Sequence, residues 1–203
     1  ELFFAGDTAL GQRPMTLERQ SSDPAFAAYR ENVRWEAGGA LFVGLNVTGS
    51  DNNYHGVHRS GGPVPEFIER SAANRAWLAQ AFALARNKKL AGVMVIIQAN
   101  PEFEAASAGN FKPGYRDFLT QLRDETQTFA GQVVLVHGDS HHQQINQPLL
   151  DAAAREVVPN FTRVETFGSP FMGWVKGTVD AADPKVFRFE PKRWRPQPAP
   201  SPN

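Results

Sequence analysis

The chain has 203 residues, of which 41% are hydrophobic and 11% aromatic, enough for one substantial core. Its 21 basic and 21 acidic residues are interspersed and give no net charge, so neither a nucleic-acid groove nor an anionic membrane surface is expected as a partner. The chain has no cysteine, which excludes disulfides, thiolate metal ligands and cysteine nucleophiles and leaves the compartment open between cytoplasm, periplasm and secretion.

No apolar stretch approaches the roughly 20 residues that cross a bilayer, so we expect a soluble protein without a membrane partner. The predicted organisation is a single domain over residues 1–190 and a proline-rich tail over residues 191–203. The amino-terminal part is the least regular, and the chain opens without methionine on an apolar run. Within the polar residues 12–35, the spacing of Phe26, Tyr29 and Val33 predicts one amphipathic helix.

The middle of the chain alternates apolar runs with helical patterns. Residues 40–45, 92–97 and 133–136 are short apolar runs typical of buried strands. Between them, residues 65–89 and 113–129 carry apolar side chains at three- and four-residue spacing and predict two helices. Strands linked through helices pair in parallel with right-handed crossovers.

The pattern changes after residue 160. Residues 161–167, 172–179 and 185–189 are short strand-like segments separated by Gly-Ser-Pro and Asp-Ala-Ala-Asp-Pro. We expect these three strands to pair antiparallel.

Three loops rich in polar residues follow the three predicted parallel strands. They span residues 46–58, 98–110 and 137–144, and two of them contain all five histidines. Because the carboxyl ends of parallel strands meet at one edge of an open α/β sheet, the loops are expected to converge there and to bind a ligand.

The third loop has the most chemical character, since residues 137–142 read His-Gly-Asp-Ser-His-His. Gly138 allows a sharp turn off the strand. Asp139, His141 and His142 then offer a carboxylate and two imidazoles, a donor set that suits zinc, manganese or iron. The alternative is a turn capped by Asp139 with both histidines exposed to solvent.

The other two loops offer amides. Gln98 and Asn100 precede Pro101 at a strand end, where amide groups either ligate a metal through oxygen, hold a phosphate through nitrogen, or satisfy loop backbone groups. The first loop begins at Asn46 and is otherwise typical of a glycine-rich surface loop.

Several motifs occur in a fixed order. Residues 74–78 read Asn-Arg-Ala-Trp-Leu, residues 98–101 read Gln-Ala-Asn-Pro after a strand, and residues 138–141 read Gly-Asp-Ser-His after the next strand. Together with residues 161–170 and 174–179, this order resembles the carboxyl-terminal half of a calcineurin-like metallophosphoesterase, over roughly residues 38–190. The resemblance implies an α/β (α+β) fold: a layered β-sandwich flanked by helices, with parallel middle strands, antiparallel carboxyl-terminal strands and an incomplete amino-terminal part.

The resemblance also implies divalent-metal-dependent hydrolysis of a small phosphate ester or phosphodiester. His141 matches the last histidine of the family's Gly-His-x-His motif, and Asp139 stands at its first histidine. Gln98 stands where the family has a strand-end histidine. We therefore expect His141, Asp139 and Gln98 to hold manganese, iron or zinc, with His141 and Asp139 catalytic.

Asn100, His142 and Asn46 are the expected substrate contacts. The family's Asp-x-His, Gly-Asp-x-x-Asp and Gly-Asn-His-Asp/Glu motifs are not intact in this sequence. Three expectations follow and stay open: one metal site in place of two, further ligands outside the sequence, or a remnant of the fold with a binding or structural role. A sheet lacking strands would also present an edge for a homo-oligomer.

A second enzyme class is weighed as well. Residues 2–8 resemble the strand and Gly-Asp-Ser opening of GDSL-type (SGNH) serine esterases, and residues 139–142 resemble their Asp-x-x-His ending. In that alternative Thr8 is the nucleophile, His142 the base and Asp139 the residue that orients it.

Overall fold

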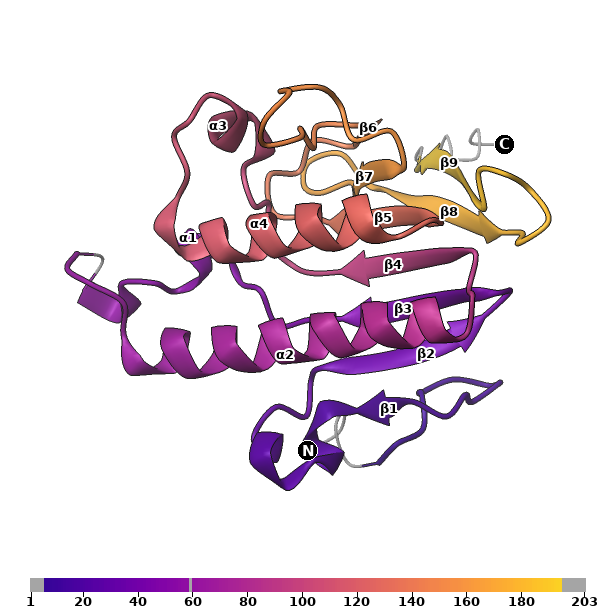
Figure 1. Ribbon diagram of the computed structural model, residues 1–203, viewed down its shortest axis with the longest axis horizontal. Coiled ribbons are helices and arrows are strands. Elements are labelled where there is room, and N and C mark those ends of the chain that lie inside the picture. The colour runs from indigo at the N-terminus through magenta and orange to yellow at the C-terminus, as the bar shows by residue number, and fades with distance from the viewer. Residues whose placement is uncertain (1–5, 59, 195–203) are drawn as a thin grey trace, which may run out of the picture.

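The computed structural model describes residues 6–58 and 60–194 and has a mixed α/β architecture around one seven-stranded sheet (Figure 1). The order of the strands across the sheet is β1-β2-β3-β4-β5-β7-β6. The strands β3, β4, β5 and β7 run parallel, and β1, β2 and β6 pair antiparallel at the two sides. The bounds of the seven strands are β1 (Glu18–Arg19), β2 (Val33–Ala37), β3 (Ala40–Gly44), β4 (Gly92–Ile96), β5 (Gln132–His137), β6 (Gln144–Asn146) and β7 (Phe161–Glu165).

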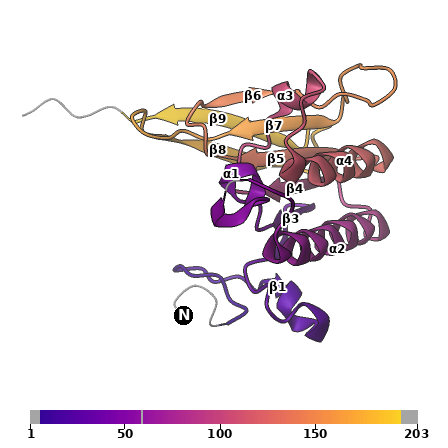
Figure 2. The ribbon, with the colours of Figure 1, turned by 90° about the vertical axis from the view of Figure 1, so that its left-hand side faces the viewer.

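Two long helices, α2 (Pro65–Asn87) and α4 (Pro113–Thr128), cover one face of the sheet (Figures 1 and 2). Each begins with a proline in its first turn, where a missing N–H costs no intrahelical hydrogen bond. The main core lies between these helices and the sheet; Phe82 of α2 and Leu122 of α4 are fully buried there. Burying one such side chain contributes about 1.5–3 kcal/mol.

A separate hairpin of β8 (Gly173–Val179) and β9 (Phe187–Arg193) covers part of the opposite face. Val175, Val179 and Phe189 of the hairpin pack on that face of the sheet and form a second, smaller core with it. The molecule therefore has three layers, and the layer formed by the hairpin contains only two strands.

The predicted parallel strands and both long helices are confirmed, with bounds shifted by two residues at most. The predicted helix within residues 12–35 is wrong. This segment contains β1, the 3-10 turns η1 (Gln20–Ser22) and η2 (Pro24–Phe26), and the start of β2. The Asp23 carboxylate accepts a hydrogen bond from the Ala25 N–H at 2.9 Å, a local turn that competes with a helix.

The antiparallel pairing predicted for residues 161–167 is also wrong, because β7 pairs in parallel with β5. Only the short β6 lies antiparallel to it. The antiparallel prediction is confirmed for β8 and β9. Since β9 continues to Arg193, residues 191–193 belong to the hairpin and not to the predicted tail. Residues 195–203 of that predicted tail lie outside the described part of the chain. In the described part of the chain no helix is long and apolar enough to span a membrane.

The remaining helical elements are short and lie in the loops at the carboxyl edge of the sheet. They are α1 (Gly49–Asn52), η3 (Gly56–His58) and α3 (Phe103–Ser107). Figure 2 looks onto this edge.

Candidate functional site

Hydrogen bonds join the three polar loops at the carboxyl edge of the sheet, as the sequence predicts. Gln98 lies between the first and third loops: its Oε1 accepts the Gly49 N–H at 2.8 Å, and its Nε2 donates to Asp139 Oδ1 at 3.3 Å. The Asn100 N–H lies 3.4 Å from Asp139 Oδ2. A methyl group at Gly49 would lie 3.3 Å from the Asp139 carboxylate. The glycine therefore lets the first loop approach Asp139 closely.

The turn at residues 139–141 holds His141 in a defined orientation. Asp139 and His141 both have left-handed backbone conformations, with φ of 76° and 64°. The His141 Nδ1 lies 2.8 Å from the Ser169 carbonyl oxygen. A carbonyl only accepts, so Nδ1 carries a proton, and in the neutral imidazole the lone pair is therefore on Nε2. Metal-binding histidines are commonly fixed in this way by a backbone carbonyl.

A buried carboxylate is hydrogen-bonded to the same turn. Glu165 at the end of β7 has no exposed surface; it accepts hydrogen bonds from the Ser140 hydroxyl and from Gln144 Nε2, the latter at 2.8 Å. Arg163, equally buried, donates to Gln144 Oε1 at 3.0 Å and to Asn146 Oδ1 at 2.9 Å. The loop that contains Asp139 and His141 is thus fixed in its middle and at its end. Neither residue could be identified from the sequence, because a charged side chain in a short strand gives no signal of its partners.

His137, the last residue of β5, is 1% exposed. Its Nε2 has no hydrogen-bond partner among the described residues. Burial lowers the pKa of His137 from its ordinary value of 6.5, and the Arg163 charge acts in the same direction, whereas the Gly138 carbonyl, Glu165 and Glu104 oppose the shift. The lowered pKa makes His137 a neutral component of the core at neutral pH.

The lowered pKa of His137 predicts a pH-dependent stability. Between pH 6.5 and the lower pKa of the folded chain, the unfolded chain binds more protons. The free energy of unfolding should therefore fall as the pH is lowered, by at most about 1.4 kcal/mol per pH unit. Urea unfolding at about pH 7.5 and about pH 5.5 measures this slope. His137→Gln should flatten it and His142→Gln, at an exposed position, should not; equal slopes in both variants would refute the assignment.

The first loop contains an unusual turn at residues 50–53. All four of these residues have φ between 53° and 56°, a conformation that is uncommon for residues other than glycine and that clusters at functional sites. Asp51 Oδ1 accepts the Gly114 N–H in the first turn of α4 at 2.9 Å, and Asn52 Nδ2 donates to the Gly114 carbonyl at 3.0 Å. Arg70 Nη1 donates to Asn52 Oδ1 at 2.6 Å. The hydrogen bonds from Asp51 and Asn52 therefore hold the first loop against the first turn of α4 at Gly114.

Gly114→Ala is predicted to destabilise this junction. An added methyl group would lie 2.0 Å from the Asp51 carbonyl oxygen, so the loop must move. The expected loss in the free energy of unfolding is about 1–3 kcal/mol, measured by urea denaturation. Gly62→Ala, where a methyl group meets no atom within 4 Å, is the matched control. A Gly114→Ala variant as stable as this control would contradict the assigned packing.

The expected substrate contacts are dispersed. The Asn46 side chain donates to Glu31 Oε1 at 2.7 Å, within the amino-terminal segment. The Asn100 side chain accepts the Glu102 N–H at 3.0 Å in a local turn, so only its backbone reaches Asp139. His142 is exposed beside the 139–141 turn. The structure thus brings together Gln98, Asp139 and the Asn100 backbone, with His141 and His142 following in the same loop.

The donor set for a metal ion is partial. Within residues 6–58 and 60–194, no group of three or more histidine, aspartate or glutamate side chains is placed to hold a metal ion. Asp139 offers a carboxylate and His141 a free Nε2, and both fit a divalent ion. Gln98 Oε1 already accepts the Gly49 N–H, which leaves one lone pair of this neutral oxygen for an ion. A metal ion here would therefore complete its coordination with water or ligand oxygens.

The serine-esterase alternative is wrong, because Thr8 lies beside β1, at the opposite edge of the sheet from the loop that contains Asp139 and His142. Thr8 forms a bridge with Thr16 beside β1, whereas Asp139 and His142 follow β5. Strands β2, β3 and β4 lie between β1 and β5, a separation of about 19 Å at the usual strand spacing. A nucleophile and its base need hydrogen-bond contact of about 3 Å.

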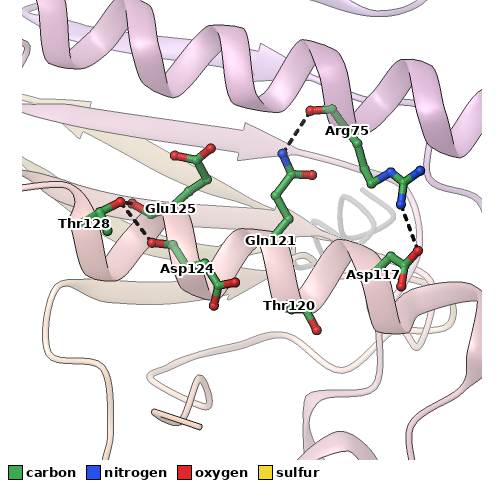
Figure 3. Close-up of a pocket in the computed structure, with 7 residues that line it drawn as sticks. All are labelled: Arg75, Asp117, Thr120, Gln121, Asp124, Glu125 and Thr128. Carbon is green, nitrogen blue, oxygen red and sulfur yellow. Dashed lines mark hydrogen bonds and ion pairs between the residues drawn. The ribbon is translucent and has the colours of Figure 1, made fainter.

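A groove of about 500 Å³ lies between α2 and α4, away from the strand ends (Figure 3). Its polar side chains largely bond to each other: Arg75 Nη1 contacts Asp117 Oδ2 at 3.0 Å, and Gln121 Nε2 donates to the Arg75 carbonyl at 2.9 Å. These contacts connect the two helices, and we assign no ligand to the groove. Its lining residues are Arg75, Asp117, Thr120, Gln121, Asp124, Glu125 and Thr128.

Comparison with known proteins gives no family for the chain. No family model matches the sequence, and no curated protein matches it.

Proposed function

We propose that the chain forms a divalent-metal-dependent phosphate ester hydrolase site at the carboxyl edge of its sheet. The observation that carries this proposal is the 139–141 turn. It combines a carboxylate at Asp139 with an imidazole at His141 whose Nδ1 is bonded to the Ser169 carbonyl, leaving Nε2 available. Oxygen and imidazole donors together suit manganese, zinc or iron.

Asp139 Oδ1 and Oδ2 and His141 Nε2 are the protein donors in this proposal. When bound, a divalent ion neutralises the phosphoryl oxygens and acidifies a water molecule for attack on phosphorus. Gln98 Nε2 and the Asn100 N–H, which contact Asp139, keep its carboxylate oriented. Both are neutral hydrogen-bond donors.

The exposed His142, next to the turn, supplies a group that donates a hydrogen bond to a phosphoryl oxygen or to the leaving oxygen. The chain has no net charge, which favours a small phosphate ester over a polyanion such as nucleic acid.

Titration of the purified chain with Mn²⁺, followed by the electron paramagnetic resonance signal of free Mn²⁺, tests the metal part of the proposal. We expect saturable binding that a chelator reverses. An unchanged free-Mn²⁺ signal at every protein concentration would contradict it.

A further inference from the structure

The β8–β9 hairpin has one strand edge whose backbone groups have no hydrogen-bonded neighbouring strand among the described residues. One backbone hydrogen bond lies just beyond each end of the β8–β9 pairing. The Trp194 N–H donates to the Met172 carbonyl at 3.0 Å, and the Asp180 N–H donates to the Val186 carbonyl at 2.9 Å. In an antiparallel pair, hydrogen-bonded and non-hydrogen-bonded positions alternate. The even-numbered residues of β8 therefore bond to β9. The odd-numbered residues of β8 point their N–H and carbonyl groups away from it.

The other long edge of the hairpin is protected. Pro191 of β9 lies opposite Val175 in the register, at a position whose N–H would point away from β8. Proline at an edge strand removes a donor that a neighbouring chain could use. At the sides of the seven-stranded sheet, β1 has two residues and β6 has three, which are short edges. Among the described strands, β8 combines seven residues, no proline and a free side.

The same residues of β8 border an apolar groove of about 260 Å³ between the hairpin and the sheet. Val175 and Val179 are only half-buried there, as are Phe42 and Ile96 on the sheet, because two strands cover part of a wider surface. Thr166 is the single residue with a polar side chain in the lining. The lining residues are Phe42, Met94, Ile96, Val136, Val164, Thr166, Val175, Gly177, Val179 and Phe189.

The free side of β8 faces the part of the sheet that the hairpin leaves open. In Figures 1 and 2, β9 lies on the side of β8 toward β6, so the opposite side of β8 faces β3 and β2. Trp35 of β2 and Phe42 of β3 stack there with ring centroids 5.2 Å apart. A strand beside β8 would lie over this aromatic pair.

We propose that the edge of β8 binds an extended segment of another polypeptide as a third strand of the hairpin sheet. Its backbone pairs with Val175 and Gly177, since the β2–β3 turn at Gly38 lies against Val179, and its alternate apolar side chains fill the groove, the mode known as β-strand addition. Gly177, in the middle of the edge, has no side chain and permits close approach. A small apolar molecule would fill the groove but leave the edge groups unpaired. A second copy pairing through its own β8 would bring its wider sheet into the space of the first.

A lysine-flanked peptide of alternating threonine and valine is the probe, and the same peptide with a central proline is its control. In ¹H–¹⁵N spectra of the full chain, we expect shifts and new protection from hydrogen exchange at the Val175 and Gly177 amides. Shifts confined to β6 or β1, the same response to the proline peptide, or no binding would overturn the proposal.

Two variants of one residue test the edge directly. Gly177→Pro removes an outward N–H without breaking a bond to β9, and Gly177→Lys places a charge in the groove, a common protection of edge strands. Each should weaken peptide binding at least about tenfold, whereas Thr178→Val, on the outer face, should not. If Gly177→Pro loses its native circular dichroism, the lysine variant decides. Unchanged affinity in a folded variant would overturn the assignment.

Discussion

His141→Ala is expected to weaken Mn²⁺ binding by at least about 10- to 100-fold, the loss found even when an outer-shell partner of a metal ligand is removed. The reason is geometric: the Ser169 carbonyl holds Nδ1 at 2.8 Å, so Nε2 is the nitrogen left to bind the ion. Asp139 and water cannot replace it. Electron paramagnetic resonance titration of free Mn²⁺ measures the change.

His142→Ala is the matched control, since His142 is the neighbouring exposed histidine and is assigned to substrate and not to metal. It should bind Mn²⁺ as the wild-type chain does. Asp139→Asn, which removes the charge and retains the shape, should also lower affinity. Unchanged metal stoichiometry in His141→Ala would end the assignment of this residue as a ligand.

Arg163→Met is expected to lower the free energy of unfolding by about 2–4 kcal/mol. The Arg163 side chain has no exposed surface and holds Gln144 and Asn146 at 3.0 Å and 2.9 Å. Its ion-pair partner Glu104 is 63% exposed, so solvent screens that pair. Most of the loss comes from the two hydrogen bonds that the buried guanidinium donates to Gln144 and Asn146. Urea denaturation gives the value.

Arg188→Met is the control for this prediction, because Arg188 forms an ion pair with Asp183 with its own side chain 71% exposed. Exposed pairs contribute little to stability, so this variant should unfold close to the wild type. Equal losses in the two variants would show that burial of Arg163 does not govern its contribution.

The parallel strands and the two long helices could be predicted from the sequence because each has a local pattern. The run at residues 92–97 is apolar at nearly every position, as a strand buried on both faces requires. Pro65 and Pro113 fix the helix starts. The meeting of Gln98 with Asp139 followed from strand order alone, since loops after neighbouring parallel strands share one edge.

The remaining features depend on contacts distant in sequence. β7 resembles any short strand, and only its partner β5 makes it parallel. Val33 fits a helical spacing, but pairing with Gly44 places it in β2. The left-handed turn at residues 50–53 is held by Gly114 and Arg70, more than 15 residues away. The role of Glu165 in holding Ser140 appears only when β5 and β7 are adjacent.

Hydrolysis of an aryl phosphodiester such as bis(p-nitrophenyl) phosphate, with Mn²⁺ added and with a chelated sample beside it, tests the proposed function most directly. The proposal predicts turnover that needs the metal ion and that is lost in His141→Ala. It would be contradicted by absence of turnover in a chain that binds Mn²⁺, or by turnover that the chelator and the His141→Ala substitution leave unchanged.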